Sequence, residues 1–67
     1  MKNFYTVFFE EKNILINKTK IVFIEATQLV GGKVNYKVHL IDKEIIDFDL
    51  ESKDERIEFG NWLGGIL

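Results

Sequence analysis

Alternating apolar and polar positions run through much of the chain and predict β-strands. The clearest alternation is VNYKVHLI at 34–41, in which every second residue from Val34 to Leu40 is apolar or aromatic. The segment IIDFDL at 45–50 alternates in the same way. Because successive side chains of a strand point to opposite faces, each segment is expected to present one apolar and one polar face.

Three earlier segments are rich in β-branched and aromatic residues, which favour strands. They are NFYTVFFE, ILI and IVFIEATQLV, separated by the polar clusters EEKN and NKTK. In the first segment the side chains of Phe4 and Phe8 face one way and those of Tyr5 and Val7 the other. Both faces are largely apolar, so we expect this strand to be covered on both sides or to lie at an interface.

The strand register can be predicted from the need to keep acids off the apolar face, since a one-residue slip reverses every side chain. A two-residue turn at Asp42–Lys43 would place Val38 opposite Asp47. A three-residue loop at 42–44 instead places Val38 opposite Phe48, and His39 opposite Asp47. We therefore predict the three-residue loop.

The same test applies to GGK at 31–33, where glycine supplies the positive φ that a tight hairpin needs. A three-residue loop here sets Glu25 opposite His39. With the previous loop, it predicts a row of Glu25, His39 and Asp47 across three strands on the polar, outer face. A histidine between two carboxylates could serve acid–base or metal chemistry, but complementary charges on a solvated sheet face are the simpler interpretation.

The end of the chain, SKDERIEFGNWLGGIL, predicts a helix over 53–63. Ser52 and Glu55 have the spacing of a capping box, and Gly64 suits the position just after a helix. The side chains of Phe59, Trp62, Leu63 and Ile66 follow the spacing of one helical face. A strand, RIEFGNW, is the alternative, because it also alternates and because Gly60 weakens a helix.

The order of these elements predicts one domain, 1–67, of the α+β class. We expect a small antiparallel β-meander of four to five strands with one C-terminal helix packed on its apolar face. A small closed β-barrel is the alternative. A chain of 67 residues buries a modest core, and without cysteine it has no disulfide to help it.

The charge and the residue composition argue against several classes of function. Net charge is −2 and cysteine is absent, so neither a basic nucleic-acid surface nor a thiolate metal site is expected. No apolar run is long enough to span a membrane, and no signal-peptide pattern opens the chain, which predicts a cytoplasmic protein. The only serine, Ser52, is better used as a cap, and no phosphate-binding loop is present. We expect no enzyme activity, no cofactor and no metal.

An apolar patch on the outer face is the candidate partner-binding site. Its members are Phe23, Ile41 and Ile45, flanked by Glu25, His39 and Asp47. The competing surface comprises Phe4, Phe8 and Trp62. The leading hypothesis is a small non-enzymatic protein-binding module, an inhibitor or accessory factor acting by protein–protein contact. The alternatives are a structural homo-oligomer and a weak single-stranded nucleic-acid binder that uses the aromatic N-terminal strand.

Overall fold

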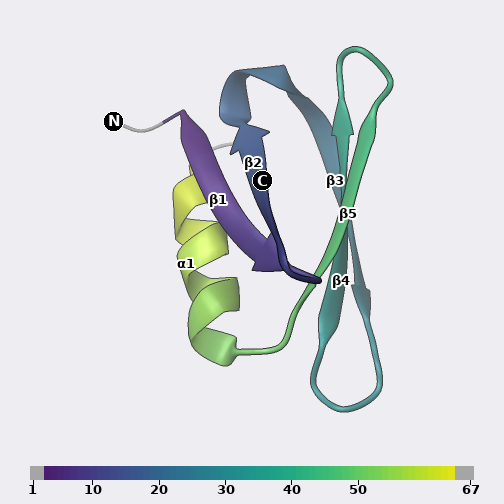
Figure 1. Cartoon of the computed structure of the whole chain (residues 1–67), viewed down its shortest axis with the longest axis vertical. Coiled ribbons are helices and arrows are strands. Elements are labelled where there is room, and N and C mark those ends of the chain that lie inside the picture. The colour runs from purple at the N-terminus through teal and green to yellow at the C-terminus, as the bar shows by residue number, and fades with distance from the viewer. Residues whose placement is uncertain (1–2, 65–67) are drawn as a thin grey trace.

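Five strands and one helix make up the computed structural model, which describes residues 3–64 (Figure 1). The elements, in chain order, are β1 Phe4–Phe9, β2 Lys12–Asn17, the short 3₁₀ turn η1 Lys18–Lys20, β3 Ile21–Gln28, β4 Val34–Leu40, β5 Ile45–Leu50 and α1 Lys53–Leu63. The α+β class, the antiparallel strands and the C-terminal helix are therefore as predicted.

The strands form two separate antiparallel sheets. One is the hairpin β1–β2, and the other has the order β3-β4-β5. The break falls at η1, where the Asn17 side chain accepts hydrogen bonds from the backbone N–H (3.1 Å) and the hydroxyl (2.8 Å) of Thr19. These bonds turn the chain out of β2 before β3 begins. No ladder joins the two sheets within residues 3–64, so the closed-barrel alternative is wrong.

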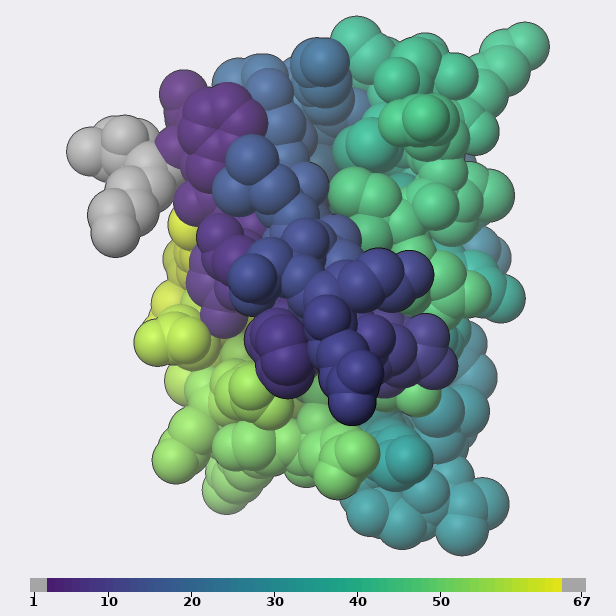
Figure 2. Space-filling model, in the orientation of Figure 1, coloured from purple at the N-terminus to yellow at the C-terminus, as the bar shows by residue number. Residues whose placement is uncertain are grey.

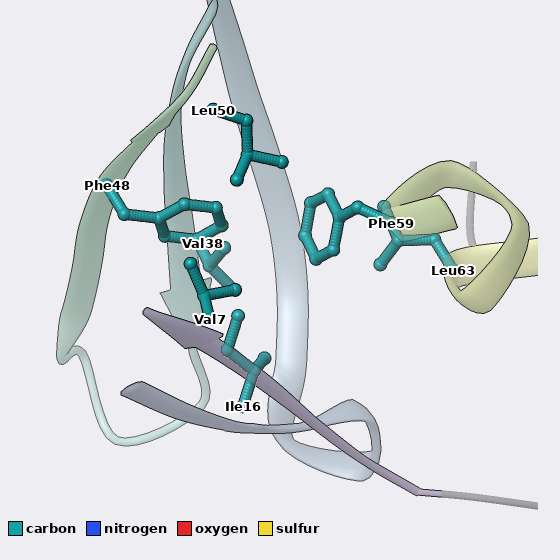
Figure 3. Close-up of a cluster of buried hydrophobic side chains, with 7 residues drawn as sticks. All are labelled: Val7, Ile16, Val38, Phe48, Leu50, Phe59 and Leu63. Atoms are coloured by element: carbon teal, nitrogen blue, oxygen red, sulfur yellow. The ribbon is translucent and has the colours of Figure 1, made fainter. Parts of the chain in front are cut away.

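The core lies where the helix, the hairpin and the three-stranded sheet meet (Figure 3). Its buried side chains are Val7, Ile16, Val38, Phe48, Leu50, Phe59 and Leu63. The ring of Phe59 connects all three parts, because it packs edge-on against Tyr36 (5.1 Å between centroids) and Phe48 (5.5 Å) and lies 5.4 Å from Tyr5. The helix thus covers the apolar face of the sheet, as the sequence predicts.

Local signals fix both ends of α1. The Ser52 hydroxyl accepts hydrogen bonds from the N–H groups of Asp54 and Glu55, which satisfies two donors that have no partner inside the helix. At the other end Gly64 has φ 52° and its N–H donates to the Gly60 carbonyl. The helix prediction over 53–63 is confirmed and the strand alternative is wrong. Of the predicted stripe, Ile66 lies outside the described residues.

Both long hairpins have three-residue loops, but each lies one residue earlier than predicted. The loops are 30–32 and 41–43, closed by bonds from Leu29 N to Lys33 O and from Leu40 N to Glu44 O. The third residue of each loop has a positive φ, 83° at Gly32 and 71° at Lys43. This loop type needs a left-handed third residue, and only the observed placement puts Gly32 there.

The shift has a specific consequence for the strand pairs. Val38 lies opposite Ile24 and Ile46, whereas the predicted partners were Ala26 and Phe48. Each partner moves by two residues, which is one full period of a strand. The predicted pairs are therefore wrong, while the residues that do pair keep their predicted assignment to the core or the outer face.

The β1–β2 turn is a tight two-residue turn built from glutamates. Glu10 and Glu11 have φ values of 52° and 62°, and Phe9 pairs with Lys12. Turns of this kind favour Asn-Gly, because a side chain with a Cβ is strained at positive φ. Pairing leaves Phe4 and Phe8 exposed on one face of the hairpin, and Val7 buried on the other. Within the described residues the strand is covered on one side only.

Candidate partner-binding surface

The outer face of the three-stranded sheet consists of three cross-strand rows. The register gives the rows as Phe23–His39–Ile45, then Glu25–Lys37–Asp47, then Thr27–Asn35–Asp49. The first row is apolar and aromatic, and the other two are polar. Ile41, in the β4–β5 loop, adjoins the apolar end, where its N–H donates to the Lys20 carbonyl (2.9 Å).

The first row is held together by ring stacking and one short polar contact. The rings of Phe23 and His39 lie 4.0 Å apart and only 10° from parallel. The Nε2 atom of His39 is 2.8 Å from Oε1 of Glu25, which belongs to the next row. Because the ring contacts both a stacked phenyl and a carboxylate, these two contacts orient it on the central strand.

The predicted apolar patch is solvent-exposed. Phe23, Ile41 and Ile45 are 50%, 65% and 54% exposed, respectively. Exposed apolar groups that adjoin one another are typical of protein contact sites, whereas isolated ones carry no such meaning. Phe23 and Ile45 flank His39 in the same row, so two members of the patch are brought together with the histidine between them.

Asp47 does not join the predicted row of Glu25, His39 and Asp47. It lies opposite Lys37, and the residue opposite His39 on β5 is Ile45. The two-residue shift of the β4–β5 register is the reason. The contact between Glu25 and His39 does form, although it is diagonal, since Glu25 lies directly opposite Lys37. No histidine between two carboxylates is present on this face.

Asn35 is a polar residue of this surface whose role no pattern in the sequence indicates. Its side-chain Nδ2 donates to Oδ1 of Asp47 (2.7 Å) and to Oδ1 of Asp49 (2.8 Å), and lies 3.3 Å from the Phe48 carbonyl. One amide thereby bridges two carboxylates that project on the same side of β5. The alternation of IIDFDL shows that the two acids share a face, but the bridging partner depends on the tertiary register.

A cleft of about 550 Å³ opens beside this acidic pair. Its walls come from the tip of the β1–β2 hairpin, from Leu29 just after β3, and from the outer faces of β4 and β5. The lining residues are Phe9, Glu10, Leu29, Asn35, Lys37, Asp47 and Asp49. Figure 2 shows the navy tip of the hairpin projecting over the teal and green strands. Carboxylates outnumber the single lysine, so the cleft is acidic.

The competing surface of Phe4, Phe8 and Trp62 is not one surface. Phe4 and Phe8 are 52% and 68% exposed on the outer face of the hairpin, where Leu15 (60%) joins them. Trp62 is half-buried against the opposite face, 5.1 Å from the Tyr5 ring, with the Lys18 ammonium 4.9 Å from its own ring centroid. The structure therefore separates Trp62 from the two phenylalanines.

The titratable groups with displaced pKa values lie on the core side, away from this surface. Burial of the ring, with the nearby Glu58 carboxylate that its hydroxyl contacts at 3.2 Å, raises the pKa of Tyr5 to about 12. Burial also raises the pKa of Tyr36, and the charge of Arg56 partly opposes this effect. Both shifts favour the neutral form of the phenol.

The described residues provide neither a metal site nor a membrane-spanning helix. Within residues 3–64, no group of three or more histidine or acidic side chains is placed to hold a metal ion. The same residues contain no helix with the length and hydropathy to cross a membrane. Comparison with models of protein families, with curated proteins and with solved structures found no match to this chain.

Proposed function

We propose that the protein is a non-enzymatic protein-binding module that uses the outer face of its three-stranded sheet. The observation that carries the proposal is the row Phe23–His39–Ile45, in which two half-exposed apolar side chains flank a histidine ring stacked on Phe23. An apolar centre beside a charged margin is the usual anatomy of a protein contact. The charged margin here consists of Glu25, Lys37 and Asp47.

The residues that most often act as nucleophiles or acid–base groups favour a binding role over catalysis. There is no cysteine, and the Ser52 hydroxyl is engaged as the helix cap. The only histidine stacks on Phe23 and contacts Glu25, on an open sheet face outside the cleft. Such a protein acts by occupying a partner's surface, in the manner of an inhibitor or an accessory factor.

Capture of a partner by tagged protein, followed by mass spectrometry, tests the proposal. The bait is compared with two outer-face variants, Phe23→Ala and Ile41→Asp, and with Phe8→Ala on the hairpin as the matched control. We expect the outer-face variants to lose the captured protein and the hairpin variant to retain it. Retention by the outer-face variants with loss by Phe8→Ala would place the interface on the hairpin.

A homo-oligomer is the second candidate function, and a specific observation favours it. The outer face of the β1–β2 hairpin presents Phe4, Phe8 and Leu15 with no charged side chain among the residues paired between them, which are Thr6, Asn13 and Asn17. An uncharged apolar surface of this kind can be buried between copies. Light scattering over a range of concentrations tests it, with Phe8→Asp expected to restore the monomer. Weak nucleic-acid binding through Phe4 and Phe8 stays a prediction, tested by a salt-dependent gel shift.

A further inference from the structure

β3 is an edge strand whose second side is open. Within residues 3–64 it has a hydrogen-bonded neighbour on one side only, β4. It is also the one strand of its sheet with no buried residue, and Glu25, Ala26, Thr27 and Gln28 are all exposed. By contrast, the other edge of the sheet, β5, buries Phe48 and Leu50 in the core. The C-terminal half of β3 is therefore accessible from both faces and from the side.

The direction of the free backbone groups on β3 follows from the ladder. The Leu29 N–H donates to the Lys33 carbonyl, so Leu29 points toward β4. Backbone groups alternate in direction along an antiparallel strand. The N–H and C=O groups of Ile24, Ala26 and Gln28 consequently point away from β4, toward the open side.

Few of the devices that protect edge strands are present here. Natural sheets block their edges with proline, with lysine, with bulges or with covering segments. The chain has no proline, and the one irregularity in β3 lies at its beginning, between Ile21 and Phe23. From Phe23 to Gln28 the only charged residue is Glu25. An open edge of this length is a template for strand addition.

The side chains beside this edge define what an added strand must carry. Glu25 and Phe23 project from the outer face with their backbone groups directed toward β4, so an antiparallel partner would set its own side chains close beside them. In the same row as Glu25, Lys37 lies on β4 and Asp47 on β5, so the row holds two carboxylates and one lysine. The edge therefore combines an acidic position with an apolar one, two residues apart.

We infer that β3 is the docking edge for an extended segment of a partner protein that adds as an antiparallel strand. In the partner, a lysine or arginine lies opposite Glu25 and an apolar residue lies opposite Phe23. Read from N- to C-terminus, the partner's motif is a basic residue, any residue, then an apolar residue. This inference rests on the proposed function and specifies its partner.

A second copy of this chain fits the edge less well. When the segment Phe23–Gln28 pairs antiparallel with itself, the open backbone groups allow Glu25 to lie opposite Phe23, Glu25 or Thr27 of the other copy. None of these residues is a cation, and facing glutamates repel. A segment of another protein can place a basic residue opposite Glu25, which self-pairing cannot do.

Amide hydrogen exchange measured by NMR tests the inference with synthetic peptides as probes. The first probe is a blocked peptide of about seven residues that alternates threonine and valine and has lysine at the position meant for Glu25. The matched control has glutamate at that position. In the free protein, we expect the amides of Ile24, Ala26 and Gln28 to exchange quickly and those of Glu25 and Thr27 slowly. The lysine peptide should slow exchange at Ile24, Ala26 and Gln28 and leave the other two amides unchanged.

Charge reversal provides the second arm of the test. In Glu25→Lys the peptide preference should invert, so that the glutamate peptide binds about 2- to 20-fold more tightly than the lysine peptide, as expected for exchanging attraction for repulsion at one cross-strand pair. Ala26→Pro removes an outward N–H and should abolish protection by either peptide. Thermal melts verify that both variants fold. If one does not, the exchange of the wild-type amides with and without each peptide tests the inference by itself.

The possible results separate this inference from the proposed function. Equal binding of the two peptides, or peptide shifts confined to Phe4 and Phe8, would overturn the β3 edge. Protection of Ile24 and Ala26 that grows with protein concentration, without peptide, would identify a second copy as the occupant and also overturn it. If Ala26→Pro still captures the same cellular partner while Phe23→Ala does not, the proposed function stands and strand addition fails.

Discussion

The ring of Phe23 lies flat against the ring of His39, with 4.0 Å between the centroids and 10° between the planes. These residues are directly opposite each other on β3 and β4, and Ile45 continues the row on β5. A cross-strand aromatic pair contributes to sheet stability by its packing, yet half of the Phe23 side chain remains exposed. The row can therefore stabilise the sheet and still present exposed surface to a partner.

Removing this ring should leave the fold intact. We expect Phe23→Ala to cost about 0.5–1.5 kcal/mol, the usual contribution of an aromatic pair, because the side chain has no place in the buried core. Ile41→Asp, on a 65%-exposed side chain, should cost less. Urea melts followed by circular dichroism measure both. If either variant unfolds, the outer face is a second core and the partner surface must lie elsewhere.

Truncating Phe59 should unfold the domain or bring it close to unfolding. The side chain is fully buried and packs on rings from both sheets. Phe→Ala in a core typically costs about 3–5 kcal/mol, against a total near the low end of roughly 5–15 kcal/mol for a chain this small. Ile57→Ala, in the same helix but 51% exposed, is the matched control and should melt near the wild type. A cooperative wild-type-like melt for Phe59→Ala would contradict this packing.

The Asn35 side chain should contribute to the free energy of unfolding, because its amide donates to two neighbouring carboxylates. Asn35→Asp replaces the shared donor with a third negative charge beside Asp47 and Asp49. We expect it to destabilise the protein by about 1–3 kcal/mol, and to do so more than Asn35→Ala. High salt should reduce the difference between the two variants, because it screens repulsion between exposed charges. Equal costs at low salt would refute the bridge.

The hairpin turn at Glu10–Glu11 offers a stabilising change. Glu11→Gly removes the strain of a Cβ at φ 62°, and glycine at this position is preferred in two-residue turns. We expect a gain of about 1 kcal/mol, seen as a higher melting temperature. Glu44→Gly is the control, because Glu44 is outside the positive-φ positions and glycine there should bring no gain. A loss of stability in Glu11→Gly would mean that the glutamate side chain makes a contribution larger than the strain.

Alkaline pH should weaken the helix–hairpin contact through Tyr5. The unfolded chain has the ordinary tyrosine pKa of about 10, while burial and Glu58 raise the pKa of Tyr5 in the folded state to about 12. The folded state thus holds this proton more tightly than the unfolded chain does. The stabilisation that the protonated Tyr5 hydroxyl gives the folded state is therefore complete below pH 10 and is lost as the pH rises from about 10 to about 12.

The Tyr5→Phe variant isolates this effect. Phenylalanine retains the packing against Phe59 and Trp62 but has no proton to lose. Urea melts at about pH 8 and about pH 11 should show a smaller loss of stability for the variant than for the wild type. Tyr36, whose pKa burial also raises, accounts for part of the remaining loss. An equal pH dependence in both proteins would contradict the role of Tyr5.

The sequence alone determined the elements and the face on which each side chain lies. Alternation with period two placed Val38 and Phe48 inside and Phe23 and His39 outside, and a slip of two residues in register leaves those assignments unchanged. The helix was determined locally as well, because Ser52 caps its start and a glycine ends it. These features depend on neighbours in the chain, so a pattern can reveal them.

The tertiary structure decided which residues meet. The separation of the hairpin from the three-stranded sheet depends on how η1 turns the chain, and the strand pairs depend on which loop residue takes the positive φ, Gly32 or Lys33. The position of Asp47 opposite Lys37, and the bridge from Asn35, follow from the same kind of choice in the β4–β5 loop, where Lys43 takes the positive φ. Contacts between strands are set by loop geometry and by packing on Phe59, and no periodicity within a single segment specifies either.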